Sequence, residues 1–293
     1  MSLSRRSFLR AGAALAGATL LPPRTVAQSP LAAGDVIQRI KDRVGIPWRT
    51  QTVDNIVFGK PDTRVRGIAT TMMATLEVMQ RAAAAGRNLV ITHEPTFYSH
   101  QDTTEPFAQD GTYQFKTAFM NQHEMVVFRF HDHWHAMRPD GVAFGMAREL
   151  GWDNHRVADN QREFTFAGVT LGQLAAQVRE RLGARTVRVV GDPEMRVNRV
   201  AASWGYYTFS AANLPLARPD IDVFVVGETR EWETVEYAQD IVASGTKKGL
   251  IVIGHVASEQ AGMKYCAEWL KGFVGEVPVE YVPASEPFWS PRG

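Results

Sequence analysis

The sequence has very little cysteine: Cys266 is the single one among 293 residues. One cysteine cannot form a disulfide within the chain, so no disulfide framework supports the fold. Cys266 follows an apolar helical pattern, and no histidine or other base stands beside it in the sequence. We therefore expect it to be a buried core residue and not a catalytic thiol.

The chain also lacks an excess of either charge. It has 32 Lys and Arg against 31 Asp and Glu, which gives a formal net charge of +1. No basic cluster stands in the body of the chain, so we expect no nucleic-acid partner. Apolar residues make up 45% and charged residues 22%, as is usual for a soluble globular protein with a sizeable core.

The N-terminus has the order of an export signal. Arg5 and Arg6 precede Ser-Phe-Leu, an Ala- and Gly-rich apolar run follows at 11–21, and small residues lead to Ala27. The run is too short to form a stable membrane anchor. The alternative is a basic tail before a disordered segment. We expect a twin-arginine signal at 1–30, recognition by the twin-arginine export machinery, and a periplasmic or secreted product.

Strands and helices alternate through the rest of the chain, as the apolar patterns indicate. The expected strands cover 65–69, 88–92, 125–130, 187–190, 197–202, 222–226 and 250–253. The expected helices cover 31–44, 74–85, 113–120, 141–150, 171–182, 231–244 and 260–270. This alternation predicts an α/β fold with parallel sheets.

Ligands of open α/β sheets bind at the C-terminal ends of the strands. His93 and Glu94 follow the apolar strand at 88–92 and precede Pro95, which ends the strand. Imidazole and carboxylate groups are ligands for zinc, manganese, iron or nickel. The pair alone is a weak signal.

A second group, His131-Asp132-His133-Trp134-His135, follows the strand at 125–130. If this segment is extended, its three imidazoles lie on one face. Three buried imidazoles would need many hydrogen-bond partners, so metal binding is a better explanation than core packing. A histidine-rich solvated loop or an interface is the alternative.

The third group follows the strand at 250–253. His255 and Glu259 stand four residues apart, and a helix that begins at once would place them on one face. The alternative is a plain strand-to-helix turn that Ser258 or Glu259 caps. Taken together, the three groups supply the five or more ligands that a two-metal site needs.

These segments resemble the GTP cyclohydrolase I type 2 homologue family, also called NGG-interacting-factor-three-like. The resemblance runs over about 31–282 and is carried by the segments 67–69, 88–95, 131–135, 222–228 and 254–259. It implies a two-domain α/β fold, a dinuclear metal site and a homo-oligomer, often a ring-shaped hexamer. We expect two similar α/β lobes with the site between them, one formed by roughly 31–160 with 220–293 and the other by 161–219.

The family motifs imply a ligand set. His93, His255 and Glu259 match the His-His-Pro and Gly-His-x3-Glu patterns, whereas Glu94 stands where the second His is expected. His135 stands where the middle motif, His-Thr-Asn-Leu/Trp-Asp, has its ligand Asp. The set of His93, Glu94, His135, His255 and Glu259 therefore still has three imidazoles and two carboxylates.

The resemblance also suggests supporting residues. His131 matches the opening His of the middle motif, and we expect His131 or His133 to shuttle protons. Glu231-Trp232 stands where members often carry His near the site, after Gly227-Glu228. We expect Glu228 and Glu231 to hydrogen-bond to the metal ligands.

Two functions remain open. One is an exported hydrolase that acts on a small-molecule substrate with two divalent transition-metal ions, zinc, iron, manganese or nickel. The other is a non-catalytic metal-binding or metal-handling protein. We do not expect GTP cyclohydrolase activity, because an exported protein would meet little GTP. An amidohydrolase-type barrel is disfavoured, because the His133-x-His135 pair has only His155 and His255 downstream of it.

Overall fold

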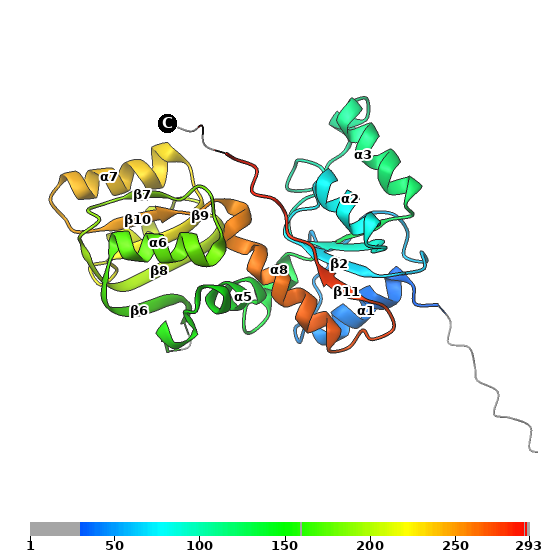
Figure 1. The fold of residues 1–293 in the computed structure, drawn as a ribbon, viewed down its shortest axis with the longest axis horizontal. Coiled ribbons are helices and arrows are strands. Elements are labelled where there is room, and N and C mark those ends of the chain that lie inside the picture. The colour runs from blue at the N-terminus through cyan, green and yellow to red at the C-terminus, as the bar shows by residue number, and fades with distance from the viewer. Residues whose placement is uncertain (1–29, 159, 290, 292–293) are drawn as a thin grey trace, which may run out of the picture. The chain divides into compact units, whose positions relative to one another are not determined.

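Two β-sheets organise the chain in the computed structural model, which describes residues 30–158, 160–289 and 291 (Figure 1). Residues 31–293 belong to one compact unit. The predicted export signal falls almost entirely on residues 1–29, which lie outside the described residues. Within the described part of the chain, no helix is both long enough and apolar enough to cross a bilayer.

The first sheet has five strands and is mostly parallel. Its strand order is β1 (Ile56–Phe58), β4 (Val126–Arg129), β3 (Leu89–Thr92), β2 (Ile68–Thr71) and β11 (Val279–Tyr281). The edge strand β1 is antiparallel to β4, and the other pairings are parallel. Every residue of β2, β3 and β4 is buried, as expected for strands that are covered on both faces.

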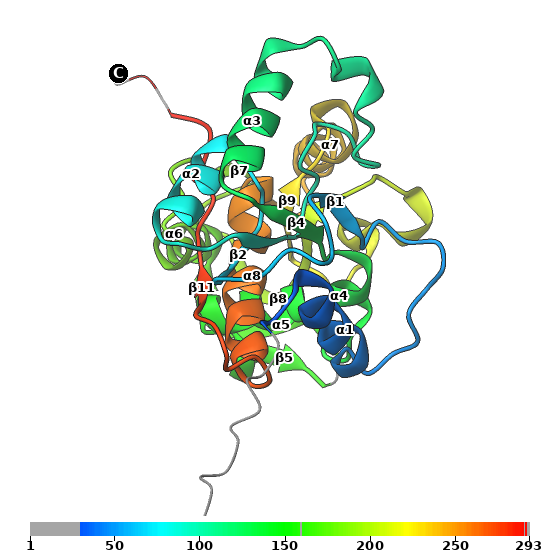
Figure 2. The ribbon, with the colours of Figure 1, turned by 90° about the vertical axis from the view of Figure 1, so that its right-hand side faces the viewer.

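Helices cover both faces of this first sheet. Figure 2 shows α2 and α3 on one face and α1 and α8 on the other. Their bounds are α1 (Ala33–Arg43), α2 (Leu76–Ala84), α3 (Gly111–Gln122) and α8 (His255–Lys271). The chain therefore builds the first sheet with parallel strands and crossover helices, as the sequence pattern predicted.

The second sheet has six strands and is mixed. Its strand order is β5 (Arg156–Val157), β6 (Asn160–Thr170), β8 (Arg196–Tyr206), β9 (Val223–Glu228), β10 (Gly249–Val252) and β7 (Arg188–Val190). The central strands β8, β9 and β10 are parallel, and the outer strands pair antiparallel. Alternate residues of the central strands enter two hydrophobic clusters, one with α6 (Leu171–Leu182) and one with α7 (Glu236–Ala243).

Helix α8 connects the two sheets, because it packs against β2 and β11 of the first and against β8 and β9 of the second. It also crosses α5 (Gly141–Leu150) closely. A Cβ on Gly145 would lie 2.5 Å from the Ala261 carbonyl oxygen, and one on Gly262 would lie 2.7 Å from Val142 Cα. Glycine is therefore needed at both positions, and α8 is held tightly where it carries His255 and Glu259.

The division of strands between the sheets differs from our expectation. We grouped 220–293 with the first lobe, but β9 and β10 pair with β8 in the second sheet, and β11 alone returns to the first. Strand β6 was not expected, because its charged residues hide the alternation of buried Phe164 and Phe166. The remaining short helices are η1 (Glu105–Phe107), α4 (Asp132–Ala136), η2 (Asp153–His155), η3 (Ala211–Asn213), η4 (Pro215–Ala217) and η5 (Glu231–Val235).

Candidate metal centre

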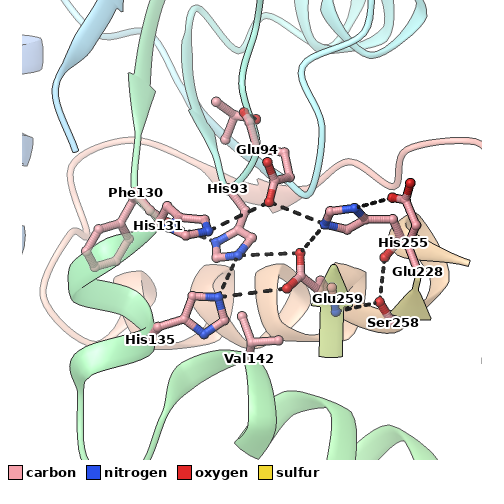
Figure 3. A network of polar contacts seen from close by, with 12 residues as sticks. His93, Glu94, Phe130, His131, His135, Val142, Glu228, His255, Ser258 and Glu259 are labelled. Carbon is pink, nitrogen blue, oxygen red and sulfur yellow. Dashed lines mark hydrogen bonds and ion pairs between the residues drawn. The ribbon is translucent and has the colours of Figure 1, made fainter. Parts of the chain in front are cut away.

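His93 and Glu94 leave the first sheet directly after β3. Their backbone amides still donate to the carbonyl oxygens of Thr71 and Met72, at 3.1 and 2.8 Å, so the ladder to β2 continues through them. His93 is fully buried, and its Nδ1 lies 3.2 Å from the Phe130 carbonyl oxygen. The sheet therefore fixes both side chains where the strand ends (Figure 3).

The segment after β4 is helical, so the extended arrangement of its three histidines is wrong. Helix α4 covers Asp132–Ala136, and His131 is its N-cap residue. Because His131 and His135 are four residues apart, the helix places them on one face. The cause lies in Asp54, whose carboxylate accepts the backbone N–H groups of His131, Asp132 and His133 at 2.7–2.9 Å. This carboxylate caps the first turn of the helix.

His133 points away from the other histidines. Its Nδ1 lies 2.7 Å from Asp54 Oδ2, and its Nε2 accepts the Arg49 backbone N–H at 2.9 Å. The ring also stacks on Trp48, with centroids 3.7 Å apart. Both ring nitrogens have protein partners, so we correct the role expected for His133: it holds α4 in place and is not a proton shuttle.

Helix α8 supplies the third part of the site. Gly254 has φ +89°, which lets the chain turn directly from β10 into the helix at His255. His255 and Glu259 then share one face, and His255 Nε2 lies 3.2 Å from Glu259 Oε2. Glu259 is 2% exposed, so its carboxylate is buried within the site.

The structure brings all five predicted ligands together, with Glu259 in the middle. Glu259 Oε2 lies 3.6 Å from His93 Nε2, and Glu259 Oε1 lies 3.8 Å from His135 Nε2. His93 Nε2 and His135 Nε2 are 3.2 Å apart, and His255 Nε2 is 3.4 Å from Glu94 Oε1. The two oxygens of Glu259 therefore face different imidazoles.

His131 joins the same cluster as a sixth group. Its Nε2 lies 3.8 Å from Glu94 Oε1, and its ring stacks on that of His93 with centroids 4.6 Å apart. Its Nδ1 lies 3.0 Å from Asp132 Oδ1. Two overlapping groups in the cluster have the spacing of metal ligands: His93 with His131 and His135, and His93 with Glu94 and Glu259.

The donor atoms fit a cation better than they fit one another. Within the described residues, His255 Nε2 and Glu259 Oε2 are buried without a hydrogen-bond partner, although they lie 3.2 Å apart. The Nδ1 atoms of His93, His135 and His255 face the Phe130 carbonyl, Asp140 and Glu228, at 3.2, 3.2 and 2.9 Å. An N–H on each Nδ1 leaves the Nε2 lone pair directed into the cluster, as in metal-binding histidines.

Charge in the cluster is tightly coupled. Burial opposes the protonation of His255, but the carboxylates of Glu259 and Glu94 raise the pKa of His255 to about 11. Burial likewise opposes the ionisation of Glu94, yet His255 and His93 lower the pKa of Glu94 to about 2. Burial, together with His93 and His135, lowers the pKa of His131 to about 4. A bound cation would take the place of the protons that these carboxylates now attract.

The two predicted supporting glutamates differ. Glu228 contacts the His255 ring, whereas the Glu231 carboxylate pairs with Arg188 at 2.6 Å on the surface, so the role expected for Glu231 is wrong. Asp140, which the sequence analysis missed, holds His135. Asp140 also caps α5 through the Val142 and Ala143 amides, and the sequence signals only this second role.

A cavity of about 400 Å³ opens beside the cluster, with Glu94 and His255 in its wall. Both side chains therefore belong to the His/Glu cluster and also line the cavity. A small molecule in this cavity would meet the cluster directly, which is the arrangement that ligand sites of enzymes have.

Comparisons with known proteins agree with the fold. The sequence model described as Duf34/NIF3 (NGG1p interacting factor 3) matches residues 32–287. The chain is 23% identical over 246 residues to a Chlamydia pneumoniae protein named GTP cyclohydrolase 1 type 2 homolog, covering 80% of this chain and 90% of that protein. A protein of the same name from Clostridium acetobutylicum is 21% identical, covering 83% and 90%.

Solved structures show the same architecture. A hypothetical protein from Staphylococcus aureus superposes with a TM-score of 0.69 at 19% identity, covering 89% of this chain and all of that one. A Bacillus cereus protein related to NIF3 superposes with a TM-score of 0.67 at 15% identity, with the same coverage. At these identities the likeness concerns the fold alone.

Proposed function

We propose, from the premise that this chain belongs to the Duf34/NIF3 family, that its cluster binds two divalent transition-metal ions and hydrolyses a small-molecule substrate. One observation carries the metal assignment: the buried His255 Nε2 and Glu259 Oε2 have no hydrogen-bond partner among the described residues, and both point into a group of His and Glu side chains. Leaving such atoms unpartnered is costly, and a cation would satisfy both.

The residues have separate roles in this proposal. His93, Glu94, His135, His255 and Glu259 would hold the two ions, with Glu259 in the middle of the group. Two such ions supply Lewis acidity and a water of lowered pKa. His131, beside Glu94 and turned toward His93, is placed to accept a proton. The metals would be zinc, iron, manganese or nickel, which share a preference for imidazole and carboxylate.

The cavity favours an enzyme over a non-catalytic metal-binding protein. A storage or structural site is closed around its ion, whereas a catalytic site leaves a position that substrate can reach. Here Glu94 and His255 line a cavity of about 400 Å³. The name shared by the curated relatives, GTP cyclohydrolase 1 type 2 homolog, describes those proteins, and we do not transfer that activity.

The experiment measures metal content and hydrolysis on the same preparations. Protein purified without added metal should contain about two transition-metal ions per chain and should cleave members of a phosphoesterase and amidase panel. E228Q replaces the carboxylate that faces His255 Nδ1 with a neutral amide, and the lost charge should weaken metal affinity roughly tenfold. E231Q is the matched control, because this carboxylate pairs with Arg188, and should leave affinity unchanged.

Two outcomes decide between the candidates. If protein that has been supplied with metal retains it only at background level, the whole proposal is contradicted. Two tightly held ions without any turnover over the panel would leave the non-catalytic metal-binding function.

Export and assembly are also part of the proposal. The Arg5-Arg6 motif supports transport through the twin-arginine route to the periplasm, and the family resemblance supports a homo-oligomer, with a hexamer as the expected form. Replacing both arginines by lysine should leave the precursor in the cytoplasm. Normal export of that variant would contradict the route.

A further inference from the structure

A buried arginine lies behind one of the expected metal ligands, and the proposed metal chemistry does not use it. Arg129, the last residue of β4, is 0% exposed. Its Nη2 lies 3.7 Å from Glu94 Oε2, and within the described residues this nitrogen is buried without a hydrogen-bond partner. A guanidinium carries a positive charge, and burying that charge is costly unless an anion lies beside it. The position of Arg129 next to the Glu94 carboxylate therefore asks for a function.

The backbone holds the rest of the Arg129 guanidinium. Its Nε donates to the His93 carbonyl oxygen at 3.2 Å, and its Nη1 donates to the His100 carbonyl oxygen. These two bonds fix the plane of the group, because the three nitrogens form a rigid fork. Nη2 is the nitrogen that is left to face Glu94.

The two oxygens of Glu94 face different surroundings. Oε1 is directed into the cluster, where it lies 3.4 Å from His255 Nε2 and 3.8 Å from His131 Nε2 (Figure 3). Oε2 faces the guanidinium of Arg129. The carboxylate thus has its metal-facing oxygen on one side and a fixed positive charge on the other.

Asp102 is the second carboxylate near this guanidinium. Its Oδ2 lies 3.7 Å from Arg129 Nη1, and its Oδ1 accepts the backbone amides of Thr96 and Phe97, at 2.6 and 2.8 Å. Asp102 therefore serves the loop that follows β3, whereas Glu94 belongs to the His/Glu cluster. Arg129 contacts both, so its role at the metal centre has to be separated from its role in the loop.

We propose that Arg129 is a positioning residue of the metal centre, which holds Glu94 Oε2 and thereby turns Oε1 toward the ions. The inference rests on the proposed metal binding, and it explains how a carboxylate serves at a position where the family resemblance leads us to expect histidine. The terminal torsion of a glutamate is broad, so a fixed partner is needed to orient its carboxylate. An imidazole would gain nothing from a cation behind it. Arg129 should therefore matter for metal binding with Glu94 in place, and not in the E94H background.

The test titrates cobalt(II) into metal-depleted protein, because cobalt accepts the same imidazole and carboxylate ligands. R129M removes the charge and the fork but keeps an unbranched side chain. Its affinity for cobalt should fall roughly tenfold or more with Glu94 in place, and by less than about twofold in the E94H background. A purely structural role of Arg129 would cost the same in both backgrounds, and equal losses overturn the inference.

The absorption spectrum of bound cobalt is a second readout, which a loss of stability alone would not move. The bands of cobalt-loaded R129M should shift toward those of E94A, which lacks the carboxylate. D102N is the matched control, because it removes the other negative charge near Arg129 but keeps an oxygen for the two loop amides. It should bind cobalt like the unmodified chain. A loss in D102N as large as that in R129M would assign the effect to the loop and overturn the inference.

A conservative variant covers the case in which R129M does not fold. R129K keeps the positive charge but not the fork, so its cobalt affinity should fall with Glu94 in place and stay unchanged in the E94H background. An equal change in both backgrounds overturns the inference. Unmodified protein that binds no cobalt overturns the proposed function and the inference together. Normal binding by the unmodified chain, with equal losses in the two backgrounds, overturns the inference alone.

Discussion

The family resemblance sets Glu94 and His135 at motif positions where His and Asp are expected, and the structure places them at different parts of one cluster. Glu94 faces His255 and His131, whereas His135 faces His93 and Glu259. Their strands β3 and β4 are neighbours, as the exchange requires. The exchange keeps the total charge of the ligand set but moves one carboxylate from the His135 position to the Glu94 position.

A double-mutant cycle tests this exchange. E94H alone leaves four imidazoles and one carboxylate against two dications, so we expect metal affinity to fall tenfold or more. E94H with H135D restores two carboxylates and should recover much of that loss, because residues that share a partner are non-additive. Titration of metal-depleted protein measures both. A double variant that binds no better than the worse single variant would falsify the exchange.

The residue scale also shows what the sequence could and could not predict. The five ligands come from short motifs at strand ends, and each motif is local, so they could be found without a structure. The inward direction of His131 and His135 could not, because it depends on Asp54, which lies 77 positions before His131.

At the scale of elements, the helices that carry complete end signals were predicted best. The bounds 141–150 and 171–182 agree with α5 and α6. Asp140 and Thr170 cap these helices at their starts, and Gly151 and Gly183, with φ +73° and +60°, end them. Strand β6 carries no such local signal, because it is stabilised by pairing with β8.

Strand β8 contacts the His/Glu cluster at one glycine. Gly205 has φ +72°, and a Cβ there would lie 2.3 Å from Glu259 Oε1. We expect G205A to displace the carboxylate and to lower metal affinity at least tenfold, measured by metal titration. G245A is the control. Gly245 also has a positive φ, +87°, but a Cβ added there would have no atom within 4 Å apart from its chain neighbours.

Both glycine variants pay the cost of a left-handed residue, about 1 kcal/mol in the free energy of unfolding. The difference between them in metal binding therefore reports on Glu259 alone. Equal metal affinity in the two variants would show that Gly205 does not position the carboxylate.

At the scale of the whole molecule, metal removal should lower stability. A ligand that binds the folded state at 100 times its Kd stabilises that state by about 2.7 kcal/mol. For a chain of this size, whose entropy of unfolding is about 0.6 kcal/mol/K, that corresponds to a melting temperature roughly 5 °C lower after chelation. Differential scanning calorimetry of metal-loaded and metal-depleted protein measures the shift. In the E259Q variant, chelation should change the melting temperature only slightly. A change as large as that of the unmodified chain would show that the stabilising metal binds outside the His/Glu cluster.

The position of α8 against both sheets has a consequence for how the chain is held together. Its residues His255 and Glu259 meet His93 and Glu94, about 160 positions earlier in the sequence. An ion shared by these groups would act as a reversible cross-link that closes a very long loop, and such links restrict the unfolded chain most. In a chain with one cysteine, metal would thus restrain the fold as disulfides do in many secreted proteins.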